Sequence, residues 1–124
     1  MNPTGKAALK SYRDLLVWQK SMDLVEHVYR LAQTFPKDEL YGLRSQMQRA
    51  AVSVPANIAE GYGRSHRGDY VHHLSIANGS LKELETLISV AGRLNYLSEG
   101  EVTRAASLLD ETGKLLHCLI KSLK

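Results

Sequence analysis

Cysteine and long apolar runs are scarce in this sequence of 124 residues, and each scarcity excludes a class of protein. The single cysteine, Cys118, cannot form a disulfide within the chain, which favours a reducing compartment. No run reaches the roughly 18 apolar residues of a membrane-spanning helix, and residues 1–11 lack the apolar segment of a secretory signal. We therefore expect a cytoplasmic protein that does not enter a membrane.

Proline is also rare, with 3 residues in the chain, so long helices are possible. The composition, 44% hydrophobic and 23% charged, argues against intrinsic disorder. No segment alternates apolar and polar residues for long enough to predict a strand. Helical periodicity instead predicts four helices, near residues 15–35, 38–63, 66–95 and 98–123.

Short connections between these helices make neighbours antiparallel, so we expect an all-α fold, an antiparallel up-down-up-down four-helix bundle. The bundle should occupy residues 12–124 as a single domain, after a flexible basic segment at 1–11. Pro55 lies inside the second helix, but the apolar pattern continues across it, which predicts a kink. Ser65 is a candidate N-cap for the third helix, and Ser98 with Glu101 predicts a capping box for the fourth.

The predicted core follows the apolar stripe of each helix. The third and fourth helices carry heptad seams, and the first helix carries two adjacent stripes that together are wider than a minimal core face. The stripes of the first helix are Trp18, Met22, Val25, Tyr29 and Ala32, and Val17, Leu24, Val28, Leu31 and Phe35. The seams of the later helices are Tyr70, Leu74, Ala77, Leu81, Leu84, Ile88 and Ala91, and Val102, Ala105, Leu109, Thr112, Leu116, Leu119 and Leu123.

The second helix is apolar on a second face, because small residues oppose its core stripe of Leu43, Met47, Ala50, Ala51, Val54, Ile58 and Tyr62. A helix that is apolar on two faces is usually buried on both, which predicts a homo-oligomer interface. The alternative is an alanine-rich helix that tolerates exposure. In the interface hypothesis Asn57 and Glu60 form hydrogen bonds, and the predicted interface residues are Ser45, Val52, Ala56, Asn57, Ala59, Glu60 and Gly63.

Catalytic and metal-binding patterns find little support in the sequence. A di-iron bundle needs Glu-x-x-His motifs, and the nearest approach here is Asp69-x-x-His72 at a helix start. The histidines 66, 72 and 73 are better explained as surface residues, and Cys118, among leucines, as a small buried residue. No nucleophile elbow or phosphate-binding loop occurs. We therefore predict a protein that is not an enzyme and has no cofactor and no metal site.

Charge is unevenly distributed between the two ends of the predicted bundle. One end holds seven basic residues against Asp14, Glu60 and Asp69, with four of the five histidines nearby. The opposite loops hold Lys37 against four acids, Asp38, Glu39, Glu99 and Glu101. Such a basic end suits a phosphate backbone, although charged ends can also simply keep a bundle soluble. The candidate nucleic-acid-binding residues are Lys6, Lys10, Arg13, Arg64, Arg67, Lys121 and Lys124.

Several segments carry a resemblance to one bacterial family. They are Asp14–Lys20 (DLLVWQK), Phe35-Pro36, Tyr41–Gln46 (YGLRSQ), Arg49–Gly61 (RAAVSVPANIAEG), Ala77–Leu81 (ANGSL) and Glu83–Glu85 (ELE). Together they resemble the four helix bundle proteins encoded in intervening sequences of bacterial 23S ribosomal RNA genes, also called S23 ribosomal proteins. The resemblance covers residues 12–124, and its most specific part is Asn57-Ile-Ala-Glu-Gly61.

The resemblance implies a four-helix protomer, a ring-shaped homopentamer and no established enzymatic activity. A related branch, the accessory proteins of diversity-generating retroelements, binds a reverse transcriptase and nucleic acid. The first hypothesis is therefore a homo-oligomer that binds RNA, or an RNA-handling protein, through its basic end. The alternative is a protein-interaction scaffold that binds no nucleic acid. Backbone binding weakens steeply with salt, whereas an apolar protein contact should not, so salt separates the two.

Overall fold

Four α-helices account for most of the chain in the computed structural model, which describes residues 9–124. They are α1 (Leu16–Ala32), α2 (Leu43–Tyr62), α3 (Arg67–Arg93) and α4 (Glu99–Ser122). Short 3-10 helices, η1 (Tyr12–Asp14) and η2 (Lys37–Glu39), precede α1 and α2. No strand occurs within residues 9–124, and the predicted all-α fold with four helices is confirmed.

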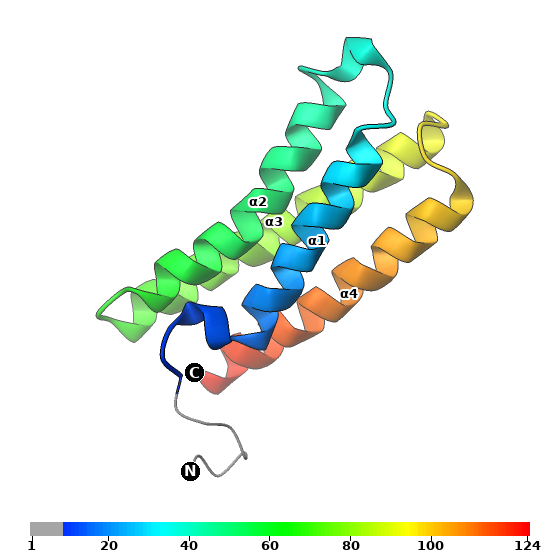
Figure 1. The fold of residues 1–124 in the computed structure, drawn as a ribbon. Coiled ribbons are helices and arrows are strands. Elements are labelled where there is room, and N and C mark those ends of the chain that lie inside the picture. The colour runs from blue at the N-terminus through cyan, green and yellow to red at the C-terminus, as the bar shows by residue number, and fades with distance from the viewer. Residues whose placement is uncertain (1–8) are drawn as a thin grey trace.

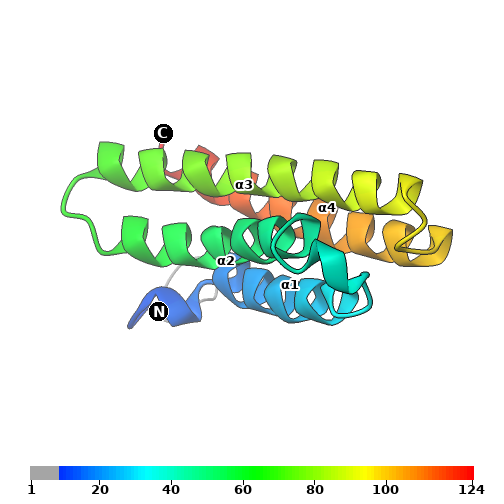
Figure 2. The same cartoon turned by 90° about the horizontal axis from the view of Figure 1, so that it is seen from above.

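Each helix doubles back along the one before it, so the elements group at two ends (Figures 1 and 2). The α2–α3 turn, η1 and the C-terminus of α4 lie at one end. The α1–α2 and α3–α4 connections lie at the other. Helices α2 and α3 share the most extensive contact of the bundle. This arrangement decides which charged side chains share an end.

The start of α2 was predicted wrongly. The periodicity predicts a helix from residue 38, but α2 begins at Leu43, after the 3-10 turn η2. The carboxylate of Glu39 folds back so that its Oε1 accepts the Leu43 N–H at 3.1 Å. A Cβ on Gly42 would lie 2.6 Å from that oxygen, so a side chain here would displace the capping carboxylate. Glu39 thus caps the helix from outside it, and the chain up to Gly42 stays in a turn.

Of the two N-caps predicted for α3 and α4, the structure confirms the one of α4. The capping box is confirmed, because Ser98 Oγ accepts the Glu101 N–H at 3.1 Å and Glu101 accepts the Ser98 N–H at 2.9 Å. Ser65 is not the N-cap of α3; His66 is, and it forms no side-chain capping bond. The turn extends one residue further than expected before helical bonding begins. Helix α2 continues through the buried Pro55 without interruption, and a kink there stays a prediction.

The core lies along the predicted seams. In α3 the seam from Leu74 to Ala91 is buried, as are four residues of the α4 seam. In α1 the stripe of Val17, Leu24, Val28, Leu31 and Phe35 is buried, whereas Met22 and Tyr29 of the other stripe are exposed. The rest of that stripe is covered, since Ala32 is buried and Trp18 and Val25 pack partly against the core, so the exposed apolar edge of α1 is narrower than the predicted stripe.

Candidate functional site

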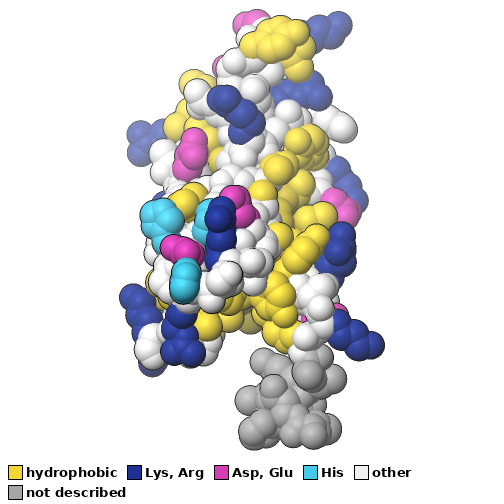
Figure 3. Space-filling view, turned by 90° about the vertical axis from the view of Figure 1, so that its left-hand side faces the viewer, with side chains coloured by type: hydrophobic (Ala, Val, Ile, Leu, Met, Phe, Trp, Pro, Cys, Tyr) yellow, Lys and Arg dark blue, Asp and Glu magenta, His cyan; other side chains and the backbone are white. Residues whose placement is uncertain are grey.

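The basic end carries exposed Lys and Arg side chains from three elements. Arg64 and Arg67 flank the α2–α3 turn, Lys10 and Arg13 belong to the segment around η1, and Lys121 and Lys124 end α4. All six residues are exposed, and Figure 3 shows His side chains close together on one face, with Lys, Arg and acidic side chains beside them. Lys6, the seventh predicted residue, lies outside the described residues. The fold thus brings together the predicted residues that it describes.

Most of these cations have no acidic partner. Arg64 is the exception, because its Nη2 lies 2.9 Å from Oε1 of Glu60, one turn earlier on α2. Within residues 9–124 the other five form no ion pair. The carboxylate of Asp14 instead accepts the backbone N–H groups of Lys10 at 2.8 Å and Ser11 at 3.3 Å. The first N–H groups of α3, beside Arg67, also lack a side-chain cap. This end is therefore chemically open to an anion.

The opposite end uses its carboxylates within the chain. Glu39 accepts the Tyr96 hydroxyl at 2.8 Å as well as the Leu43 N–H. These two hydrogen bonds, the backbone one first, lower the pKa of Glu39, and the bond to Glu39 raises the pKa of Tyr96. Glu101 is held in the capping box. Two of the four acids at this end, Glu39 and Glu101, thus fasten a loop and helix starts, whereas most bases at the other end have no such partner.

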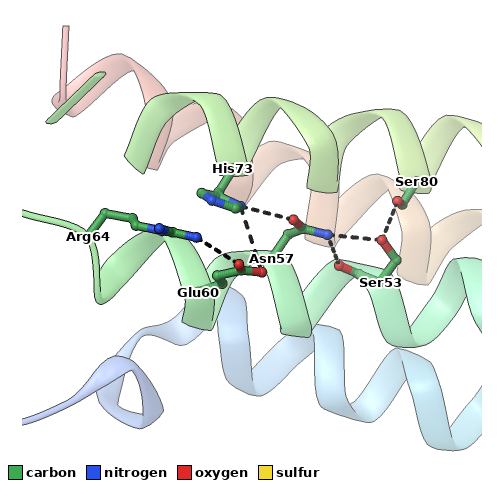
Figure 4. Close-up of polar contacts among 6 residues, drawn as sticks. All are labelled: Ser53, Asn57, Glu60, Arg64, His73 and Ser80. Carbon is green, nitrogen blue, oxygen red and sulfur yellow. Dashed lines mark hydrogen bonds and ion pairs between the residues drawn. The ribbon is translucent and has the colours of Figure 1, made fainter. Parts of the chain in front are cut away.

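A polar ladder joins α2 to α3, and Figure 4 shows it. Ser80 on α3 donates to Ser53 Oγ at 2.8 Å. The amide nitrogen of Asn57 donates to the Ser53 carbonyl at 2.9 Å and to its hydroxyl at 3.0 Å. The Asn57 carbonyl faces His73 Nδ1 at 3.2 Å. Asn57, predicted as an interface residue, therefore has hydrogen-bond partners inside its own chain.

His73 was predicted to be a surface histidine, and that prediction is wrong. Its side chain is only 14% exposed, because Asn57 and Glu60 of α2 lie against it. Gly61 makes this contact possible, since a Cβ there would lie 2.8 Å from the His73 Cβ. The spacing held a signal for the ladder, with Ser53 and Asn57 one turn apart facing residues one heptad apart on α3. The sequence reasoning did not pair them.

An apolar strip is partly exposed along α1 and α2. We define it as Trp18, Met22, Val25 and Tyr29 of α1 with Val52, Ala56 and Ala59 of α2. Met22, Tyr29 and Val52 are 37%, 38% and 42% exposed, and Ala56 is exposed as well. Figure 3 shows a band of hydrophobic side chains running down the molecule. Of the other predicted interface residues, Ser45 is half-buried, whereas Gly63 and Glu60 are exposed.

The two halves of the strip lie on adjacent edges of their helices. The opposite edge of α1 carries His27 and faces α4, and burial there, followed by the nearby Arg104 of α4, lowers the pKa of His27. At 100° per residue Trp18 and Val25 lie on the other edge, toward α2. Val52 and Ala59 of α2 lie on the far side from Ser53 and Asn57, which face α3. The strip is therefore one surface across the α1–α2 junction.

Reactive groups are sparse in the described part of the chain. Cys118 is exposed, not buried as predicted, because its edge of α4 borders two hollows. The larger hollow, about 700 Å³, lies between α3 and α4 above Leu81 and Leu109. Among residues 9–124 no three His, Cys, Asp or Glu side chains lie close enough together to hold a metal ion. No helix in that range is long and apolar enough to cross a membrane.

Comparisons with known proteins identify a family, and they match several chains of solved structures, one of them in a crystal structure. Residues 13–118 match the model of a family described as 23S rRNA-intervening sequence protein. The crystal structure is that of a protein of unknown function from the S23 ribosomal protein family of Bacteroides thetaiotaomicron. It is 24% identical with a TM-score of 0.79, over 86% of this chain and 99% of that chain, which shows a shared fold. No curated protein matches the chain.

Proposed function

This chain belongs to the 23S rRNA-intervening sequence protein family, and we propose that it is a non-enzymatic homo-oligomer that binds RNA through its basic end. The observation that carries the proposal is the set of six exposed cations at the basic end, five of which form no ion pair within residues 9–124. Phosphate groups are the complementary ligand, and binding of this kind carries no sequence information. The family name makes RNA the first nucleic acid to test.

Self-association is the second part of the proposal, and the apolar strip supports it. Soluble monomers rarely leave contiguous apolar surface of this kind uncovered without a binding role. Another copy of the chain would bury Met22, Tyr29, Val52 and Ala56. The expected number of subunits is five, as the family resemblance implies. Protomers pointing the same way around a ring would repeat the basic end once per subunit, which multiplies the sites for phosphate.

The test is the salt dependence of RNA binding, measured by fluorescence anisotropy with a labelled oligouridylate. Arg64→Gln with Arg67→Gln should lower the magnitude of the salt slope by roughly 0.7–0.9 for each phosphate group that is no longer bound. The matched control is Lys37→Gln with Arg93→Gln, two exposed cations at the opposite end. This control should leave the slope unchanged.

Two results would count against this function. Equal effects from both pairs of substitutions would mean general attraction to the whole protein surface rather than binding at one end. Absence of binding by the wild-type protein at low salt would favour the alternative, a protein-interaction scaffold. One observation supports the scaffold: Tyr41, in the α1–α2 connection, is 92% exposed, and so large an aromatic side chain is available for contact with another protein.

A further inference from the structure

One carboxylate at the basic end is shared between two cationic side chains. Oε1 of Glu60 lies 2.9 Å from Nη2 of Arg64, and its Oε2 lies 4.0 Å from Nδ1 of His73 (Figure 4). Arg64 is about half exposed, with 48% of its side chain accessible, whereas the side chain of His73 is only 14% exposed. The partner of the exposed arginine is therefore also the nearest anion to the covered histidine.

The polar ladder fixes how His73 can take up a proton. Asn57 donates both of its amide hydrogen bonds to Ser53, so its carbonyl oxygen faces His73. A carbonyl oxygen only accepts, so Nδ1 of His73 carries a hydrogen and Nε2 is the basic nitrogen. Protonation at Nε2 keeps the bond to Asn57 and adds a positive charge to the ring. That charge appears beside Glu60 without breaking the ladder.

Few other charged groups face His73. From α2 they are Glu60 and, through it, Arg64. On α3 itself the neighbours are Asp69, one turn earlier, and His72, whose ring centroid is 5.9 Å away. Among residues 9–124 Glu60 is the one acid within ion-pair distance of His73. His72 is exposed and forms no ion pair within the same range, so it offers a matched control.

We propose that His73 is a proton-dependent control of Arg64, a device that rests on the proposed RNA binding. When His73 is neutral, Glu60 pairs with Arg64 alone, and a phosphate group must compete with that carboxylate. When His73 is protonated, it shares Glu60, and Arg64 is released toward the ligand. Acidification across the range in which imidazoles take up a proton then tightens RNA binding through an arginine that does not itself titrate.

The first test needs no RNA. Relaxation of the Arg64 Nε–H group, measured by NMR at about pH 8 and about pH 5.5, reports whether the arginine is held or mobile. Its mobility should rise on acidification in the wild-type protein and in His72→Gln. It should not change with pH in His73→Gln, where glutamine retains an N–H for Asn57. Equal behaviour of His72→Gln and His73→Gln would overturn the proposal.

The second test measures binding of the same oligouridylate at the two pH values. His73→Gln should lose about two- to fivefold of the tightening on acidification, the size expected for one exposed ion pair, and His72→Gln should lose less. In an Arg64→Gln background, His73→Gln should have no further effect on the pH response beyond that of His72→Gln. Persistence of the full His73 effect in that background would overturn the control through Arg64.

Glu60→Gln separates the device from simple damage to the fold, because its expected effect has the opposite sign. It should bind RNA more tightly than the wild-type protein at about pH 8 and respond less to acid. Dissociation of the oligomer by Glu60→Gln would assign this residue to the subunit interface and contradict the proposal. If the wild-type protein binds no RNA at either pH, the proposed function fails, while the NMR result still decides the relation between His73 and Arg64.

Discussion

Beside its buried apolar stripe, α2 has two edges on which the usual distribution of polar and apolar side chains is reversed. On the side that meets α3, Ser53 and Asn57 are half-buried and hydrogen-bonded to Ser80 and His73. On the side that meets solvent, Val52 is 42% exposed and Ala56 is exposed. On these two edges polar groups are thus hydrogen-bonded inside the protomer, while apolar groups lie at its surface. The inner side makes its hydrogen bonds within the protomer, and the outer side is exposed at the surface.

This difference indicates what kind of contact the outer side can make. A polar interface would use the hydrogen-bonding groups of α2, but the ladder already uses those of Asn57. What remains across the α1–α2 junction is apolar surface. Its burial against another chain would stabilise the contact by about 25 cal/mol for each Å² removed from water. The subunit interface that we propose is therefore apolar at its centre, with charged residues at its margin.

The largest expected effect is that of a charge placed on the outer side. Ala56→Arg should weaken self-association by about 3 kcal/mol or more, roughly a hundredfold, because the interface would bury an unpaired cation. Helicity measured by circular dichroism should stay near that of the wild-type protein, since Ala56 is exposed in the protomer. Thr86→Arg, on an exposed part of α3, is the control and should assemble normally. A loss of helicity in Ala56→Arg would instead place this residue in the protomer core.

The inner side is broken most directly at Gly61. A Cβ there would lie 2.8 Å from the His73 Cβ and 3.0 Å from the Tyr70 ring, so Gly61→Ala should destabilise the protein by about 1–3 kcal/mol. Gly79→Ala, in α3 with open space around it, should stabilise it by about 0.5–1 kcal/mol. Urea unfolding measures both. Equal changes in the two variants would mean that α2 and α3 do not approach each other closely at Gly61.

Two substitutions of moderate effect separate the sides of α2. Asn57→Ala removes the bonds to Ser53 and leaves the Nδ1–H of His73 without its partner, which should cost about 1–2 kcal/mol of unfolding free energy. Val52→Ala should change the stability of the dissociated protomer by less than about 0.5 kcal/mol, because Val52 is exposed, yet it should weaken assembly. Urea unfolding in an Ala56→Arg background measures the stability of the dissociated protomer. Sedimentation of the single variants measures their assembly. A loss of protomer stability in Val52→Ala with none in Asn57→Ala would contradict this assignment of the two sides.

The smallest expected effect concerns acid and the N-terminus of α2. The Leu43 N–H and then the Tyr96 hydroxyl lower the pKa of Glu39 in the folded protein. This group therefore contributes stability above its unfolded pKa, and that contribution is lost as the pH falls through the lowered folded pKa. Tyr96→Phe should retain most of the Glu39 contribution to the acid dependence of stability, because the Leu43 bond is the larger cause of the lowered pKa. Glu39→Gln should remove that contribution. Urea midpoints between about pH 6 and about pH 3 test this, and an unchanged acid dependence in Glu39→Gln would refute it.

Periodicity predicted the helices and the seams of α3 and α4 because regular spacing directly reports the direction of the core. It could not predict the start of α2, which depends on Glu39 and its long-range bond to Tyr96. It also overestimated burial of Met22, Tyr29 and Cys118. An apolar stripe locates the middle of a buried face, but its width depends on how closely the neighbouring helices approach.

The candidate site was predictable where it depends on topology and not where it depends on tertiary packing. Alternating helix direction was enough to expect Arg13, Arg64 and Lys121 at one end. The burial of His73 was not expected, because it requires Gly61 to bring α2 and α3 close together. The spacing of Glu60 and Arg64 is that of an i, i+4 pair and is readable from the sequence, but the second partner of Glu60 comes from another helix. The contact of Glu60 with His73 therefore follows from tertiary structure alone.

Self-association through the apolar strip is the central claim, and sedimentation velocity of the wild-type protein across micromolar concentrations tests it most directly. A closed multimer whose sedimentation coefficient stays constant over that range is the predicted result, with five subunits as the expected number. A protein that sediments as a single 13.8 kDa chain at every concentration would contradict the claim.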